Sequence, residues 1–161
     1  MSEEQQFIQG EFTRTLGDRF RVTLPTELDK VFKPKNGNCA IVKERPGCLS
    51  LWEAEVWASH LDTRIELIQL RLRTGDIKQR TPELQRFGRL LSTRHRLIRL
   101  EGKGRLVLPD GFREFLAVKP EGEVVFVGAY HCIEIWHPEK WINYQENDIP
   151  EFDNLVNLLS H

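Results

Sequence analysis

Two similar stretches of sequence decide the fold. Residues 16–25 read LGDRFRVTLP, and residues 100–109 read LEGKGRLVLP. Each combines a leucine that ends an apolar strand, a polar turn with glycine, an arginine that starts a second strand and a proline that ends it. Glycine supplies the positive φ that tight turns between strands require. The sequence therefore predicts short strands on both sides of each turn, at 12–16, 21–24, 97–100 and 105–108.

The two stretches belong to a repeat that covers most of the chain. When the sequence is shifted so that Leu16 meets Leu100, a distance of 84 residues, it aligns with itself without a gap. The four tryptophans then form two equivalent pairs, Trp52 with Trp136 and Trp57 with Trp141. Self-similarity of this kind indicates a repeated structural unit. We expect two copies, at 13–57 and 97–141, packed about a pseudo-twofold axis.

The rest of each copy carries signals of short helices and a second hairpin. Pro25 and Pro109 suit the first position of a helix, which needs no N–H there. The apolar faces of these helices are expected at Leu28, Val31 and Phe32, and at Phe112, Phe115 and Leu116. Apolar runs around polar turns then predict hairpin strands at 39–42, 49–52, 124–127 and 132–136.

A different pattern joins the copies. Apolar residues at helical spacing predict one amphipathic helix over 53–73, with a stripe of Trp57, Leu61, Ile65, Ile68 and Leu72. After a polar loop, Thr81 and Pro82 signal the start of a second helix. Its expected buried stripe is Leu84, Phe87, Leu90 and Leu91. We expect the two helices to form an antiparallel pair packed on the sheet. The tail is acidic and polar from 145 to 153, and its apolar end at 155–159 either docks or stays mobile.

The repeated motifs resemble those of the MraZ family, whose halves are each an AbrB-like unit. The resemblance extends to Gly10, to the stretches RFGRLL at 86–91, FVG at 126–128 and EIW at 134–136, and to Trp141. It implies an α+β fold in which two tandem AbrB-like, swapped-hairpin units form a pseudo-twofold small β barrel, with a helical pair between and after them. The implied division is 7–57 for the first unit, 58–95 for a helical linker, 96–144 for the second unit and 145–161 for an acidic tail.

The first motif departs further from the family pattern than the second. Gly17 stands where the family has aspartate, and Phe20 stands where it has the turn glycine. Asp18 is a candidate for supplying the missing carboxylate. In the second motif Glu101 replaces the aspartate, while Gly102 to Arg105 keep the glycine and basic pattern. DNA recognition by the first copy is therefore open.

The resemblance implies a bacterial transcriptional regulator that forms rings and binds short DNA repeats upstream of the division and cell wall gene cluster containing its own gene. Guanidinium groups projecting from hairpin turns can bind phosphate or a guanine edge through two hydrogen bonds. The candidate DNA-binding residues are Arg19, Arg21, Lys103 and Arg105, with Arg14 and Arg99 on the preceding strands. A structural alternative exists for Arg21 and Arg105, which could instead hold a carboxylate such as Glu101.

Charge is unevenly distributed along the chain. The 161 residues carry 23 Lys and Arg and 24 Asp and Glu, a net charge of -1. Residues 60–105 have 12 basic against 5 acidic side chains, whereas residues 106–161 have 3 against 10. Such asymmetry either presents one positive face or merely solvates helices. The arginines at 86, 89, 94 and 96 could form a solvated helix face or a subunit contact.

Other function classes find little support in the sequence. It contains no phosphate-binding loop, nucleophile elbow, zinc-protease helix or dinucleotide fingerprint, so we expect no enzyme, catalytic residue, cofactor or small-molecule substrate. The three cysteines lack zinc-site spacing, and we expect reduced thiols and no metal. The tryptophans, Cys48 and Cys132 are predicted to lie in the core.

The sequence also gives expectations for the location and the partners of the protein. No apolar run approaches the length of a membrane span, and residues 1–10 have no apolar centre of a secretory signal. The expected partners are double-stranded DNA and further copies of the chain in a homo-oligomeric ring, in the cytoplasm and associated with the nucleoid. The alternative function is a ring-forming assembly or protein-binding module that lost DNA binding in the first motif.

Overall fold

The computed structural model describes residues 7–161, and residues 1–6 lie outside the described part, including most of the stretch searched for a secretory signal. The strands are β1 (Glu11–Thr15), β2 (Arg21–Thr23), β3 (Asn38–Arg45), β4 (Cys48–Glu53), β5 (His95–Arg99), β6 (Arg105–Val107), β7 (Glu123–Ala129) and β8 (Cys132–Trp136). The α-helices are α1 (Thr26–Asp29), α2 (Ala54–Thr74), α3 (Thr81–Thr93), α4 (Phe112–Leu116), α5 (Pro138–Asp148) and α6 (Phe152–Leu159).

The strands form a six-stranded sheet and a separate two-stranded ribbon. The order in the larger sheet is β1-β7-β8-β4-β3-β5, the ribbon consists of β2 and β6, and all neighbours are antiparallel. The first strand of each copy pairs with the other copy, because β1 lies beside β7 and β5 lies beside β3. The predicted α+β class is confirmed, and the two copies exchange their first strands.

The pairing shows the pseudo-twofold relation between the copies. Val22 of β2 pairs with Leu106 of β6, and Ser50 of β4 pairs with Glu134 of β8. In both pairs the partners are equivalent positions, 84 residues apart in the sequence. The ribbon and the centre of the six-stranded sheet therefore lie on the pseudo-twofold axis.

The expectation of a repeat without a gap is wrong in β3. Thr15 pairs with Glu123, whereas its counterpart Arg99 pairs with Asn38, which lies 85 rather than 84 residues before Glu123. A register shift between Lys43 and Arg45 compensates for this difference before β4 begins. A β-bulge absorbs one extra residue in this way, so the two copies differ by a local insertion that the alignment of the tryptophans concealed.

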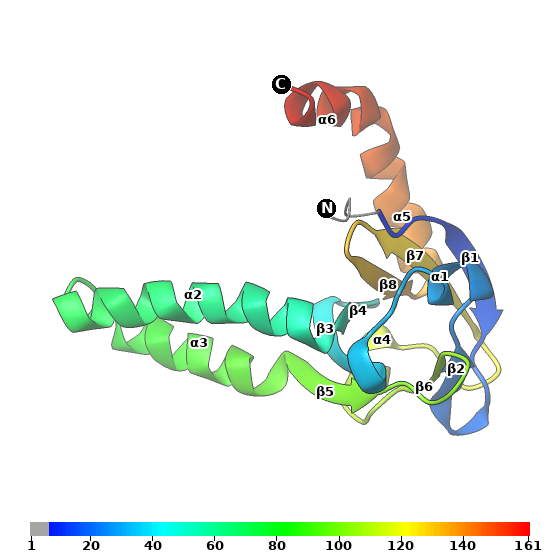
Figure 1. The fold of residues 1–161 in the computed structure, drawn as a ribbon, viewed down its shortest axis with the longest axis horizontal. Coiled ribbons are helices and arrows are strands. Elements are labelled where there is room, and N and C mark those ends of the chain that lie inside the picture. Colours follow the sequence, from blue (N-terminus) through cyan, green and yellow to red (C-terminus); the bar gives the residue numbers. More distant parts are fainter. Residues whose placement is uncertain (1–6) are drawn as a thin grey trace.

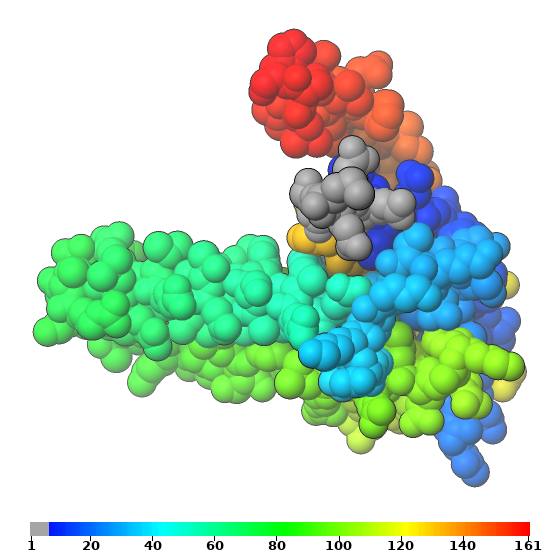
Figure 2. Space-filling model, viewed as in Figure 1, coloured from blue at the N-terminus to red at the C-terminus, as the bar shows by residue number. Residues whose placement is uncertain are grey.

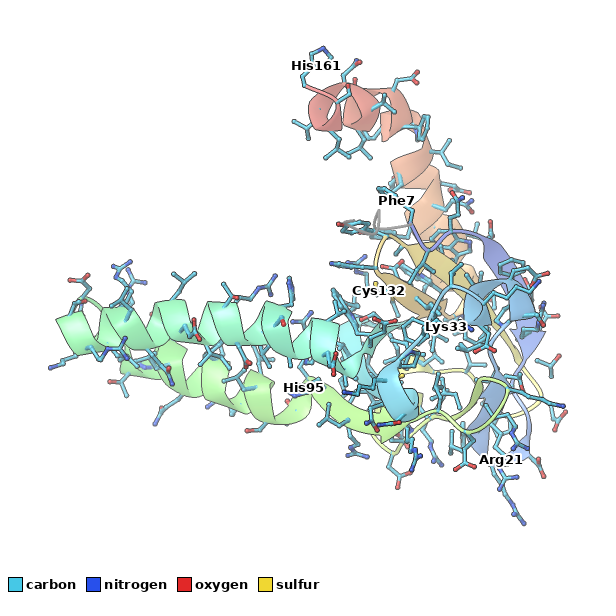
Figure 3. The ribbon with its side chains drawn as sticks, viewed as in Figure 1. Phe7, Arg21, Lys33, His95, Cys132 and His161 are labelled. Carbon is cyan, nitrogen blue, oxygen red and sulfur yellow. The ribbon has the colours of Figure 1, made fainter. Side chains whose placement is uncertain are left out.

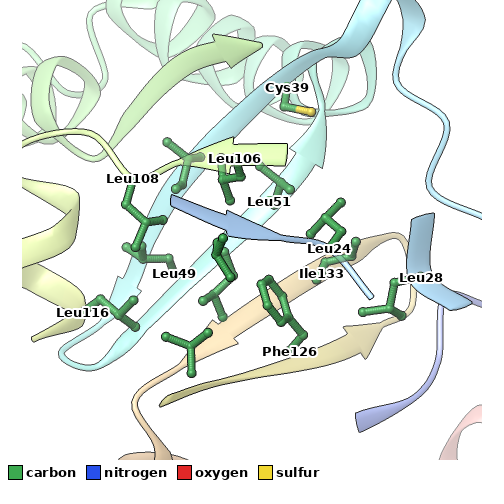
Figure 4. Packing of buried hydrophobic residues seen from close by; sticks show 14 of the residues in the cluster. Leu24, Leu28, Cys39, Leu49, Leu51, Leu106, Leu108, Leu116, Phe126 and Ile133 are labelled. Carbon is green, nitrogen blue, oxygen red and sulfur yellow. The ribbon is translucent and has the colours of Figure 1, made fainter. Parts of the chain in front are cut away.

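One hydrophobic cluster lies between the two sheets (Figure 4). Val22 and Leu106 point into it from the ribbon and are at most 5% exposed. Leu49 and Ile133 reach the same cluster from β4 and β8. Because successive side chains of a strand point to opposite faces, burial of the middle residue of β2 and β6 turns their other side chains outward.

The helices that join the copies form an arm, defined here as residues 54–93, which projects from one end of the sheet (Figures 1 and 2). The predicted helical spans are confirmed, but the expected packing on the sheet is wrong. Trp57, in the first turns of α2, is the helix's one buried residue, and α3 has none. A helix of 21 residues is about 31 Å long, so α2 extends well beyond the sheet that its base contacts.

The apolar stripes of the arm are consequently only half-buried. Leu84, Phe87 and Leu91 are partly covered, and Leu90 is exposed, where the sequence predicted a buried stripe. Val31, predicted for the apolar face of the first short helix, is also exposed, because α1 ends at Asp29. Pro25 and Pro109 precede α1 and α4 rather than opening them.

The predictions for the core residues are largely confirmed. Trp52, Trp57 and Trp136 are buried, and Trp141 is half-buried against Trp136. The three cysteines are free and buried. Burial raises the pKa of the Cys39 and Cys132 thiols to about 12, with Glu53 and Glu134 respectively as the largest added charge effects, so these thiols are not reactive at neutral pH.

Candidate nucleic-acid interface

The β2–β6 ribbon presents a short outward face on the pseudo-twofold axis. Arg21 pairs with Val107, and Thr23 pairs with Arg105. All four side chains are exposed, while Val22 and Leu106 between them are buried. Figure 3 places Arg21 at the edge of the molecule, away from His95 at the base of the arm and from His161 at the end of α6.

The two turns at the ends of the ribbon have the same backbone conformation. Arg19 and Phe20 have φ of 59° and 58°, and Lys103 and Gly104 have φ of 65° and 73°. The Gly17 N–H donates to the Arg21 carbonyl at 2.7 Å, and the equivalent Glu101 N–H donates to the Arg105 carbonyl at 2.9 Å. Each turn therefore ends in an exposed cation, Arg19 at one end of the ribbon and Lys103 at the other.

The structure brings three of the six candidate residues to one groove. Arg14, Arg21 and Arg105 line a cavity of about 580 Å³ that runs along the ribbon. Arg99 and Lys103 line a neighbouring hollow of about 330 Å³. Glu101 borders both hollows, and Arg19 borders neither, because it stands at the tip of its own turn. Residues from both copies thus meet at the groove.

Hydrogen bonds to backbone carbonyl groups hold the guanidinium groups of several of these side chains. Arg105 Nε donates to the Gly102 carbonyl at 3.1 Å, and Arg99 Nε donates to the Asn36 carbonyl at 3.0 Å. Arg14 Nη1 donates to the Thr13 carbonyl at 2.8 Å. A guanidinium has five N–H donors, so each of these groups keeps donors for a ligand.

The internal clip considered for Arg21 and Arg105 is not formed in this conformation. Within residues 7–161, neither guanidinium lies within 4.0 Å of a carboxylate, and Glu101 has no ion pair. An exposed arginine without an internal carboxylate partner can bind an anion at low desolvation cost. The groove is therefore suited to phosphate oxygens or base edges.

Sequence reasoning missed several residues that line the groove, and three of them are exposed side chains suited to a contact. Thr23 and Thr26 offer hydroxyl groups, and Val107 offers an apolar edge. The signal for Thr23 and Val107 was available, since each lies two residues after a candidate arginine and so on the same face of its strand. Thr26 lies at the start of α1, three residues after the end of β2, and lines the same groove.

The described residues offer no alternative metal or membrane site. Across residues 7–161, no three His, Cys, Asp or Glu side chains are arranged to hold a metal ion. No helix in this part of the chain has both the length and the apolar character needed to cross a bilayer.

Comparison with known proteins finds similarity along most of the chain. The family model described as "MraZ protein, putative antitoxin-like" matches residues 94–157. Three similar proteins, each named Transcriptional regulator MraZ, come from Natranaerobius thermophilus (28% identical, covering 91% of this chain and 92% of the relative), Syntrophomonas wolfei (27%, 92% and 96%) and Clostridium botulinum strain Alaska E43 (26%, 87% and 88%). The family match includes the better-preserved second motif, and the relatives extend the similarity over both copies. This chain is therefore similar over about nine-tenths of its length to proteins named as MraZ transcriptional regulators, and its second copy matches the MraZ family model.

Proposed function

We propose that this protein is a sequence-specific DNA-binding transcriptional regulator whose targets are short promoter repeats upstream of the division and cell wall gene cluster. The observation that carries the proposal is the outward face of the β2–β6 ribbon. There, Arg21 and Arg105 are exposed, have no carboxylate partner within residues 7–161 and line one groove.

The ribbon has a shape that DNA can accommodate. The major groove of B-DNA admits a two-stranded β-ribbon, and arginine there forms two hydrogen bonds to a guanine edge. In the proposed complex Arg21 and Arg105 contact base edges or phosphates, and Thr23 adds a hydroxyl contact. Arg19 and Lys103, at the two turn tips, bind flanking phosphates, which position the protein without reading sequence.

Repetition is needed for useful affinity. A single ribbon offers few phosphate contacts, and few contacts bind weakly at physiological salt. We infer that the chain assembles into a homo-oligomeric ring, so that several ribbons engage successive DNA repeats and raise the effective concentration at each site. The units at 7–57 and 96–144 then act as one small β barrel that presents the ribbon, while 58–95 and 145–161 are left for contacts between protomers. Such a regulator would work in the cytoplasm at the nucleoid, without a membrane or a small-molecule substrate.

The test is a mobility-shift titration of the full-length protein on the region upstream of its own gene, with unrelated competitor DNA. The variants are Arg19→Ala/Arg21→Ala in the first copy and Lys103→Ala/Arg105→Ala in the second. Lys35→Ala/Lys140→Ala is a matched control, because it also removes two exposed cations but from the segment before β3 and from α5. Specific binding weakened by both ribbon variants, and not by the control, supports the proposal.

Two other outcomes would change it. Loss of binding in the second-copy variant alone would show that the first copy supports the fold without contacting DNA. No specific shift by the wild-type protein, at concentrations where it is oligomeric, would overturn the proposal. The alternative would then stand, namely an assembly or protein-binding module that lost its DNA site.

A further inference from the structure

The C-terminal helix α6 presents an apolar stripe that no residue within 7–161 covers. Phe152, Leu155, Val156 and Leu159 are spaced by three or four residues, so they lie on one face of the helix. Their exposed fractions range from 47% to 80%. An isolated helix of eight residues is only marginally stable in water, so α6 gains stability when another surface covers this stripe.

Acidic side chains without ion pairs surround the stripe. Residues 138–161 carry five Asp and Glu against one Lys. Asp148, Glu151 and Asp153 flank the start of α6, all are exposed, and no ion pair to them forms within residues 7–161. The partner surface should therefore combine exposed apolar side chains with cations.

The arm carries a surface with these properties. Leu67 and Leu70 of α2 are 61% and 49% exposed. Arg64 and Arg71 lie three and four residues from Leu67, so they border the same face of the helix. Residues 60–94 carry eight Lys and Arg against four Asp and Glu. Residues 60–94, most of the arm and its junction with β5, thus have an excess of four positive charges, and residues 138–161 have an excess of four negative charges.

We propose that α6 of one protomer packs on the outer face of α2 in a second copy of this chain, with its apolar stripe on Leu67 and Leu70 and its acidic residues beside Arg64 and Arg71. The same protomer does not satisfy this contact. Residues 146–161 are exposed throughout, and α6 stands away from the arm (Figures 1 and 2).

This contact joins two different surfaces, so it is heterologous. Each protomer offers one α6 and one arm, and repetition of the contact closes a ring or grows a filament, depending on the angle between neighbours. The inference rests on the ring assembly proposed above and names the surfaces that build it. The DNA-binding ribbon is not among these surfaces.

Charge reversal tests the contact in the full-length protein. The first variant is Glu151→Arg/Asp153→Arg in α6, and the second is Arg64→Glu/Arg71→Glu in the arm. All four side chains are exposed, and the surface ion pair of Arg71 with Asp76, at 3.0 Å, is of a kind that contributes little to folding. Sedimentation velocity should show a large loss of the oligomer for each variant alone, with an unchanged circular dichroism spectrum.

Mixing the two variants gives the decisive result. Reversed α6 then faces reversed arms, so an equimolar mixture should recover the wild-type sedimentation coefficient in oligomers that alternate the two chains. Variants that remain fully oligomeric alone, or a mixture that stays dissociated, would overturn the inference while leaving DNA binding untouched. A monomeric wild-type protein would instead overturn the proposed ring. DNA binding is tested separately, by the mobility-shift assay.

Discussion

The two turns of the ribbon share one backbone but differ in how their neighbours accommodate them. In the second copy, Gly104 is buried, and a Cβ there would lie 3.0 Å from Asp29 Oδ1 and 3.2 Å from Leu24 Cβ. In the first copy, the equivalent Phe20 carries a full ring, and the guanidinium of Arg113 lies 4.2 Å from its centre. Asp29 and Arg113 are themselves equivalent positions of the repeat.

This difference shows that the glycine signature is not what shapes the turn. The same closing hydrogen bond and the same left-handed φ values occur with and without glycine. Pairing of β2 with β6 imposes the turn, and a cation placed over the ring stabilises the bulky residue. The erosion of the first motif therefore alters the neighbourhood of the turn, while the backbone at Arg19 and Arg21 keeps the conformation found at Lys103 and Arg105.

The largest effect is expected when the first-copy residue is placed in the second copy. Gly104→Phe should destabilise the protein by about 3 kcal/mol, because a non-glycine residue at φ 73° costs about 1–2 kcal/mol and overpacking against Asp29 and Leu24 costs more. Urea unfolding measures this change. Gly102→Ala is the control, since a Cβ there meets no atom within 4 Å. Equal stability of Gly104→Phe and wild type would show that the second turn adapts as the first does.

The next effect concerns DNA. If the pseudo-twofold relation extends to recognition, Arg21→Ala and Arg105→Ala should each weaken specific binding about tenfold, or about 1.4 kcal/mol. If the lost contact is to phosphate, each substitution should also reduce the number of counterions released on binding by about one, which is read from the slope of log affinity against log salt concentration. Mobility-shift titrations at several salt concentrations provide both quantities. A loss confined to Arg105→Ala would break the comparison and leave the first copy a structural element.

A smaller effect is expected from the contact between Phe20 and Arg113. Phe20→Gly relieves about 1 kcal/mol of backbone strain but removes a cation–π contact of about 0.5–1 kcal/mol, so its net effect should be small. A double-mutant cycle with Arg113→Ala should give a coupling of about 0.5–1 kcal/mol in thermal unfolding. The cycle is needed because Arg113 also pairs with Asp110 and donates to the Leu108 carbonyl. Zero coupling would mean that the ring position is incidental.

The smallest effect concerns the aromatic clusters of the two copies. Trp136 and Tyr144 in one cluster lie under Arg45, whereas Trp52 in the other contacts His60 and His131. Burial, and then the nearby His60, lower the pKa of His131 below its ordinary value of 6.5. The buried Nδ1 of His131 also has no hydrogen-bond partner within the described residues, so protonation is poorly accommodated there.

Because the pKa of His131 is lowered in the folded protein, folding stability should decrease as the pH falls. As the pH falls below 6.5, the unfolded chain takes up the His131 proton before the folded chain does, so folding stability decreases. His131→Gln should therefore flatten the decline in stability as the pH falls below about 6.5. Urea unfolding at each pH measures the difference, with His161→Gln at the exposed C-terminus as control. Parallel pH curves for His131→Gln and wild type would contradict the expectation.

Much of the local structure could be predicted from particular residues. The glycine turns of the two motifs indicated the short strands beside them, and the spacing of Trp57, Leu61 and Ile65 indicated α2. The spacing of apolar residues and the residue types of turns are local signals that extend over a few positions. They can therefore be recognised without knowing which segment packs against them. The packing of the arm could not be predicted, because a half-covered stripe and a buried one have the same spacing.

The sequence by itself determined the repeat, the positions of the strands and of the two long helices, the candidate cations and the resemblance to the MraZ family, because these depend on residue types and their spacing. The tertiary structure alone decided that β1 and β5 exchange between the copies and that a bulge offsets β3. It also decided that Arg14, Arg21 and Arg105 line one groove. Those features depend on contacts between residues far apart in the chain. Local patterns allow several strand pairings, and the pairing that forms is the one that buries a single hydrophobic core shared by both copies.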